Sequence, residues 1–168
     1  FDARSELYLL YHREATDEEN AALDRVAEAV KARVESESGI GIEIIYNRLN
    51  RRKIDLIPEW SDPPKSQINK LLKETEKRLR EGGYSPGIRG VYEAAERYAR
   101  EMGLAYARIT SDVKHVEVGL TDKSDSLRWI LREVAERRNI PYHDILVLGD
   151  EFGPVAGFEG SDFRMVLP

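Results

Sequence analysis

Apolar and polar positions along the chain alternate in blocks that predict a repeated order of helix, strand and strand. Apolar residues at steps of three or four predict an amphipathic helix over 17–36, and Thr16 with Glu19 predicts a capping box at its start. Two runs rich in β-forming residues, 42–48 and 53–60, then predict a hairpin.

The same order of elements recurs in the next block. Apolar spacing predicts one helix that ends at Gly82 and another over 88–102. The runs 106–112 and 115–121 predict a second hairpin, and strict alternation in the latter indicates one buried face. A short apolar run at 6–12 predicts a further buried strand. These elements together predict one mostly antiparallel sheet with helices on one face.

The pattern changes in the last third of the chain. A helical pattern over 127–134 is followed by the continuous apolar run 145–148, which predicts a strand buried on both faces, as in a parallel sheet. Asp150 follows this run, at the end of a strand where open α/β sheets bind ligands. We therefore expect an α/β protein with an αββ-repeat α+β domain over 1–118 and part of a Rossmann-like parallel α/β domain over 119–168.

Composition limits the classes of function. The 168 residues are 41% hydrophobic and 34% charged, with a net charge of −5, which disfavours a nucleic-acid binder because phosphates would be repelled. The absence of cysteine excludes disulfides, thiolate metal sites and cysteine nucleophiles. No apolar run reaches the roughly 20 residues that span a bilayer, and no signal segment begins the sequence, so we expect a cytoplasmic protein without a membrane partner.

Acidic residues cluster near the predicted end of the apolar strand. Asp150, Glu151 and Asp162 offer oxygen ligands of the kind that Mg²⁺ prefers, although Asp150 alone would also suit a strand end and turn. Lys123 stands in the first turn of a predicted helix, where the helix dipole disfavours a cation. Its ammonium either faces a phosphate or a carboxylate nucleophile, or is solvated beside two neighbouring aspartates.

Four segments resemble the C-terminal part of phosphatases of the haloacid dehalogenase superfamily. The resemblance is closest to the branch with a type-two α/β cap, which includes Cof-like, sucrose-phosphate and trehalose-phosphate phosphatases. The similar segments are 115–118, 122–127, 146–150 and 160–165. The resemblance implies that Lys123 is the family's conserved lysine and that Asp150 is the first acid of its metal motif. It further implies that Asp162 or Glu151 is the second acid, and that the αββ repeat is the cap.

The resemblance implies Mg²⁺-dependent hydrolysis of a small phosphomonoester through an aspartyl-phosphate, with Lys123 neutralising the nucleophile and the phosphoryl oxygens. Two features depart from the family. Asp162 follows Asp150 at a longer interval than the family's second acid, and no Asp-x-Asp-x-Thr/Val nucleophile motif precedes the cap. We therefore expect an incomplete catalytic core that is inactive by itself. The alternative is a binding or regulatory domain that has lost the nucleophile.

Basic residues gather at the predicted hairpin turns. The first turn carries Arg48, Asn50, Arg51, Arg52 and Lys53, and the second carries Lys114 and His115. Arginine forks suit phosphate oxygens and asparagine suits sugar hydroxyls, so these turns would contact a phosphorylated small metabolite such as a sugar phosphate. The alternative is a solvated loop whose charges keep strand edges from pairing. No aromatic residue interrupts the first turn to stack on bases, which disfavours nucleic acid.

Overall fold

The computed structural model describes residues 13–61, 64–149, 152–154, 157–158 and 162–166. The strand expected at 6–12 lies outside these residues, as do Asp150 and Glu151. The main elements, in chain order, are α1 (Asp17–Ser38), β1 (Glu43–Arg48), β2 (Arg51–Asp55), α2 (Ile68–Glu81), α3 (Gly87–Glu101), β3 (Arg108–Ser111), β4 (His115–Gly119) and α4 (Lys123–Ile130). The chain is thus a mixed α/β protein in which the predicted order of helices and hairpins is confirmed.

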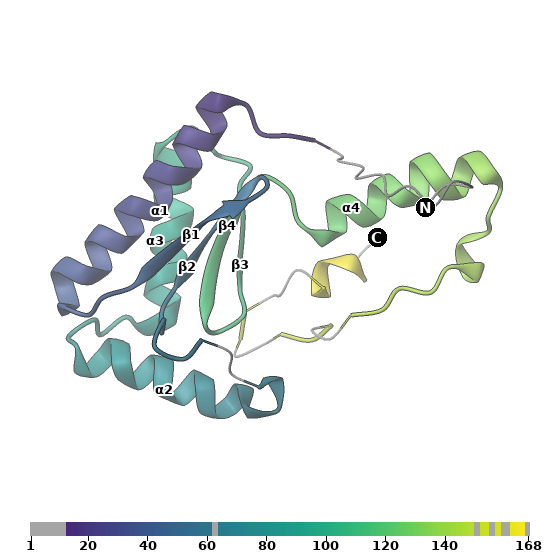
Figure 1. Ribbon diagram of the computed structural model, residues 1–168. Helices are drawn as coiled ribbons and strands as arrows, with labels where there is room; N and C mark the ends of the chain where they lie inside the picture. Colours follow the sequence, from purple (N-terminus) through teal and green to yellow (C-terminus); the bar gives the residue numbers. More distant parts are fainter. Residues whose placement is uncertain (1–12, 62–63, 150–151, 155–156, 159–161, 167–168) are drawn as a thin grey trace.

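The four strands form one antiparallel sheet in the order β1-β2-β4-β3. The two hairpins join through β2 and β4, where Ile54 lies opposite Val116 and Lys53 opposite Glu117. Helices α1 and α3 cover one face of the sheet, and α2 lies beside its end (Figure 1). The core lies between the sheet and these helices, since Ile54, Val116 and Val118 are fully buried there.

Helix α1 begins where its cap was predicted. The Thr16 hydroxyl accepts from the Glu19 amide at 3.2 Å, and the Glu19 carboxylate accepts from the Thr16 amide at 3.0 Å, which completes the capping box. The helix ends at Gly39, whose φ of 70° is a left-handed conformation that closes a helix. In the described part of the chain, α1 is the longest helix, and no helix there is both long and apolar enough to cross a bilayer.

Asn50 controls the tight turn between β1 and β2. Its φ of 58° is left-handed, a conformation that asparagine tolerates better than most residues. Its side-chain oxygen accepts from the Ala15 amide at 2.7 Å, its amide group donates to the Arg13 carbonyl at 2.6 Å, and its backbone carbonyl accepts from Leu120. Asn50 therefore ties the start of α1 and the end of β4 to the hairpin.

The C-terminal part differs from the predicted parallel domain. Helix α4 continues through a π-helical turn, Leu131–Ala135, and a 3₁₀ turn, Glu136–Arg138. Residues 145–149 then run without a strand partner, and Leu146 and Leu148 are 80% and 78% exposed. The doubly buried strand predicted at 145–148 is therefore not formed, because no other strand among the described residues lies beside it. Among the residues described after β4, no parallel strand pairing is present.

Replacing Asn50 tests whether the turn holds the fold together. We expect Asn50→Ala to lower the free energy of unfolding by about 2–4 kcal/mol, because it loses both side-chain hydrogen bonds and forces alanine into a left-handed conformation. Asn50→Gly also loses the side-chain hydrogen bonds, but glycine adopts the left-handed conformation without strain. It should therefore lower the free energy of unfolding by only about 1–2 kcal/mol. Urea unfolding of the three proteins gives the comparison. Equal losses of unfolding free energy in both variants would show that the left-handed backbone conformation does not contribute to the effect.

Candidate functional site

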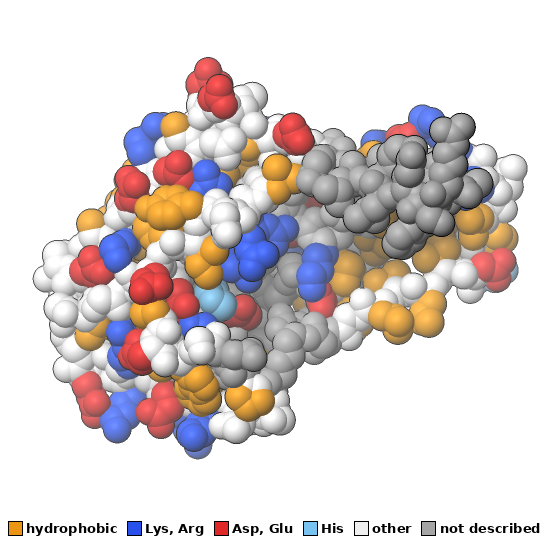
Figure 2. Space-filling view, in the orientation of Figure 1, with side chains coloured by type: hydrophobic (Ala, Val, Ile, Leu, Met, Phe, Trp, Pro, Cys, Tyr) orange, Lys and Arg blue, Asp and Glu red, His pale blue; other side chains and the backbone are white. Residues whose placement is uncertain are grey.

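The face of the sheet opposite α1 and α3 is polar and looks toward the part of the molecule that contains α4 (Figure 1). Strand alternation places Arg51 and Lys53 on this open face, while Arg52 turns toward α1. Figure 2 shows Lys and Arg side chains gathered where the sheet meets the C-terminal part. The open face is therefore the surface on which the predicted basic turn residues can meet a ligand.

Glu117 balances the two cations of β2 on the open face. Its carboxylate lies 2.5 Å from Lys53 Nζ and 3.2 Å from Arg51 Nη1. The pairing register explains the contact, since Lys53 and Glu117 are directly opposite each other in β2 and β4. Two cations share one carboxylate here, so this part of the open face keeps an excess of positive charge.

Lys114 is built into the fold instead of reaching the open face. Its side chain is 6% exposed, and its Nζ lies 2.6 Å from both carboxylate oxygens of Asp55 and 3.0 Å from the Ile57 carbonyl. An ammonium group has three N–H donors, and these three acceptors use them all. The structure therefore gives Lys114 a structural role that leaves no donor for a substrate.

His115 is oriented by carboxylates on both sides of its ring. Its Nδ1 lies 2.9 Å from Asp112 Oδ2, and its Nε2 lies 3.8 Å from Asp55 Oδ2. Burial opposes the ionisation of Asp112, but the hydrogen bonds from the ring and backbone of His115 hold the pKa of that carboxyl below its ordinary value. The ring is therefore part-buried and held in one orientation by these contacts, which suits a residue that positions a ligand.

The residues predicted for the first turn separate into exposed and buried ones, and the prediction of a turn is wrong for Arg51, Arg52 and Lys53, which lie in β2. Arg48 is exposed, whereas Arg52 is 8% exposed, pairs with Asp24 and donates to Asn20 Oδ1 at 3.3 Å. Together with Asn50, it serves the packing of the hairpin on α1. Of the five residues predicted to contact a substrate here, the structure leaves Arg48, Arg51 and Lys53 on accessible surface, because period-two alternation buries the residue between the last two.

Three distant segments meet beside the first turn of α4. Lys123 is the first residue of the helix, and its ammonium pairs with the carboxylate of Asp162, which is fully buried. Gly149 packs against the same carboxylate, since a Cβ at that position would lie 2.7 Å from Asp162 Oδ2. The structure thus brings together Lys123, Asp162 and the residue immediately before Asp150, three of the segments on which the resemblance depends.

Asp122 connects this cluster to the sheet. It caps α4 by accepting from the Ser124 amide at 2.8 Å, and it is 4% exposed. Arg164, two residues after Asp162, donates to Asp122 Oδ2 at 3.2 Å and to the Ile109 carbonyl at 3.3 Å. Neither Asp122 nor Arg164 is among the site residues predicted from the sequence, although an aspartate three residues before Asp125 at a helix start is a recognisable capping signal.

Asp162 offers one part of a site for a hard cation. Its carboxylate is the kind of oxygen ligand that Mg²⁺ accepts, but it is fully buried, already paired with Lys123 and in close contact with Gly149. Within the described ranges, no group of three histidine, cysteine, aspartate or glutamate side chains is close enough to hold a metal. The other two predicted ligands, Asp150 and Glu151, lie outside those ranges.

Comparison of the chain with protein-family models, curated proteins and solved structures gives no match. The interpretation of the site therefore depends on its geometry and on the motifs in the sequence.

Lys114 can be tested as a structural residue. We expect Lys114→Met to lower the free energy of unfolding by about 3–5 kcal/mol, because it leaves the buried carboxylate of Asp55 without its cation. Combining it with Asp55→Asn removes that charge and should recover part of the loss. Lys73→Met, at an exposed position of α2, is the matched control and should change little. Chemical unfolding that gives equal stabilities for the Lys114 and Lys73 variants would contradict the assignment.

The lowered pKa of Asp112 predicts a dependence of stability on acid. Its folded pKa lies below the ordinary value of 3.8, so its contribution is fully present well above that value. The contribution is lost as the pH falls through the folded pKa. Asp112→Asn should thus destabilise the protein at about pH 6, with the gap narrowing toward about pH 3. Urea unfolding across this range measures the gap, and a constant gap would exclude the ion pair as its cause.

Proposed function

We propose that these residues form the cap and part of the catalytic core of a Mg²⁺-dependent phosphatase of the haloacid dehalogenase type. Its substrate would be a small phosphomonoester in the cytoplasm, such as a sugar phosphate. The nucleophilic aspartate would come from residues outside these 168, in line with the absence of its motif from the sequence. The observation that carries the proposal is the meeting of Lys123, Asp162 and Gly149.

The contact between Lys123 and Asp162 supports the proposal because its residues are remote in sequence. A lysine at the first position of a helix opposes the helix dipole, which calls for a compensating contact. Here the compensation comes from a buried carboxylate 39 positions away, not from the neighbouring aspartates. A cation held against an acidic centre by long-range packing is suited to neutralise an anionic substrate and nucleophile.

In the proposed enzyme, different residues of the chain would bind the phosphate and the metal ion. Lys123 would donate to a phosphoryl oxygen and offset charge that develops during transfer. Asp162, with Asp150 and Glu151 as further candidates, would hold Mg²⁺. When bound, the metal ion would offset the charge of the phosphate and orient it.

The open face of the sheet would hold the remainder of the substrate. Arg51 and Lys53 share a single carboxylate, so they retain donors for anionic or hydroxyl oxygens. His115 adds a ring fixed between Asp112 and Asp55. A surface of directed charged donors suits a hydrophilic small molecule.

The exposed apolar segment after α4 supports the expectation of further core elements. Leu146 and Leu148 lie on an extended stretch, and both are largely exposed. Such exposed apolar residues beside unpaired backbone groups are costly unless another strand covers them. In the proposed enzyme, the part of the core that carries the nucleophile would pair with this stretch.

The complete gene product that contains these residues tests the activity. We expect Mg²⁺-dependent release of phosphate from at least one ester in a panel of sugar and polyol phosphates. Lys123→Met and Asp162→Asn should each lower kcat by about 100-fold or more, because each removes charge at the reacting phosphate. The matched control is Lys70→Met, which should leave kcat unchanged. Lys70 lies on α2, with its ammonium over the ring of Trp60.

Two outcomes would contradict the proposal. Normal turnover in the Lys123 variant would remove that residue from the site. Binding of phosphorylated metabolites with no hydrolysis of any ester would favour a binding domain instead.

Substrate recognition by the open face has a separate test. The double variant Arg51→Ala and Lys53→Ala should raise KM for the best sugar phosphate about tenfold or more, because it removes two charge-assisted contacts. KM for a minimal ester that cannot reach the sheet should not change. An equal rise for both substrates would show that the open face does not contact the sugar.

A further inference from the structure

A polar cavity lies beside Asp122, and neither Lys123 nor Asp162 lines it. It occupies about 420 Å³ between the edge strand β3, helix α3 and the start of α4. Its charged and polar lining is Glu96, Arg108, Asp122, Ser124, Arg128 and Arg164. The volume is in the range of small-molecule sites, and Lys123 is not among the lining residues.

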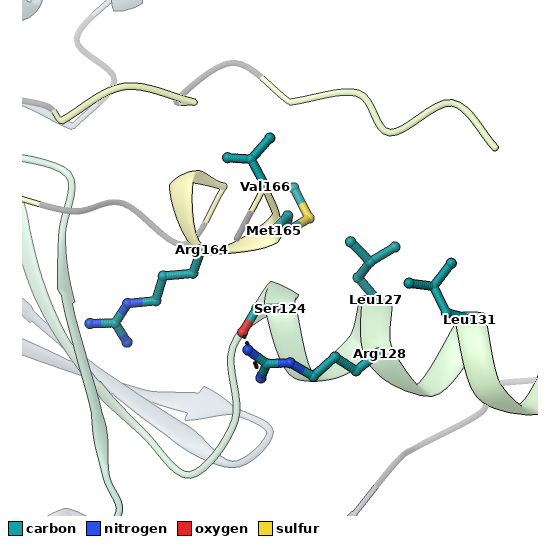
Figure 3. A pocket seen from close by; sticks show the side chains of 7 residues that line it. All are labelled: Ser124, Leu127, Arg128, Leu131, Arg164, Met165 and Val166. Carbon is teal, nitrogen blue, oxygen red and sulfur yellow. Dashed lines mark hydrogen bonds between the residues drawn. The ribbon is translucent and has the colours of Figure 1, made fainter. Parts of the chain in front are cut away.

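Three arginines from three elements converge on this cavity. Arg108 comes from β3, Arg128 from α4 and Arg164 from the turn after Asp162. Figure 3 shows the guanidinium groups of Arg128 and Arg164 directed toward the sheet, away from the apolar side chains between α4 and the C-terminal turn. The lining thus brings three guanidinium groups together with Asp122 and Glu96, and Asp125 contacts Arg108 and Arg128 from beside the cavity.

The carboxylates near the arginines are already engaged by backbone amides. Asp122 accepts from the amides of Ser124 and Asp125, and Asp125 accepts from the Asp122 amide at 3.0 Å. Burial opposes the ionisation of Asp125, but the hydrogen bond from the Asp122 amide and the guanidinium of Arg108 lower the pKa of its carboxyl. These two acids therefore cap α4 and also pair with the arginines, so what the arginines can offer a ligand is their remaining N–H donors.

The arginine contacts with these acids are long. Arg108 lies 3.4 and 3.5 Å from the Asp125 oxygens, and Arg128 lies 3.4 Å from both Asp125 Oδ1 and Ser124 Oγ. Charge-assisted hydrogen bonds between such groups are typically about 2.7–2.9 Å long. Each guanidinium has five N–H donors, and these contacts use two on each arginine. With side chains 39% and 57% exposed, Arg108 and Arg128 keep donors for a ligand that enters from solvent.

We propose that this cavity binds a small organic anion through bidentate contacts to Arg108 and Arg128, with Arg164 forming its inner wall. The ligand class is a carboxylate or a phosphate, whose paired oxygens match the fork of a guanidinium. The site is separate from the Lys123–Asp162 pair and does not depend on the proposed phosphatase activity. Since Arg164 lies two residues from Asp162, an anion bound here would adjoin the segment that positions that carboxylate.

Titration of the chain with malonate and with inorganic phosphate tests the proposal. Both are used without metal at constant ionic strength, and isothermal calorimetry together with the arginine Nε–Hε resonances reports binding. We expect saturable binding of at least one anion, with shifts of the Arg108 and Arg128 resonances and none at Arg132, an exposed arginine paired with Glu133 outside the cavity. Stronger binding of malonate would identify a carboxylate ligand, and stronger binding of phosphate a phosphorylated one.

Variants complete the test. Arg128→Gln and Arg108→Gln should each weaken the affinity about tenfold, whereas the matched control Arg132→Gln should leave it unchanged. Arg128 lies at an exposed helix position, so its variant should fold, which the amide spectrum verifies. Absence of saturable binding, or equal weakening by the Arg132 control, would overturn the proposal.

Discussion

The buried carboxylate of Asp122 is the contact on which the C-terminal half of the structure depends. It lies three residues after the end of β4, caps α4 through two backbone amides, and accepts from Arg164. One side chain thereby joins the sheet, the helix and the turn that contains Asp162. Lys123 is adjacent to Asp122, so the cap also determines where its ammonium meets Asp162. Both candidate sites are built around this single hydrogen-bonded acid.

The two faces of the sheet have different roles. Its inner face supplies apolar residues to the core beneath α1 and α3, and its open face carries paired charges. The antiparallel join of β2 to β4 sets which charges meet, because it places Lys53 opposite Glu117 and Asp55 opposite His115. A shift of β2 by one residue would turn Lys53 and Asp55 toward the core and separate them from Glu117 and His115.

Local patterns predicted the elements well, whereas the roles of single polar residues depended on tertiary contacts. The capping box at Thr16 and both hairpins follow from neighbouring residues, and the structure confirms them. The burial of Lys114 depends on Asp55, which is remote in sequence, so no local pattern reveals it. The burial of Arg52 could have been predicted, because alternation along β2 turns its side chain to the opposite face from those of Arg51 and Lys53. The apolar run 145–148 predicts burial, but a strand is buried only where neighbouring elements cover it. The run itself does not reveal whether such neighbours are present.

We propose that Lys123 and Asp162 stand at a phosphate and metal centre. A crystal structure of the complete gene product with Mg²⁺ and a phosphate mimic such as tungstate tests it most directly. We expect an oxyanion within about 3 Å of Lys123 Nζ and a metal ion coordinated by Asp162 or by Asp150 or Glu151. An oxyanion bound elsewhere, with Lys123 still paired to Asp162 and no metal beside it, would contradict the account.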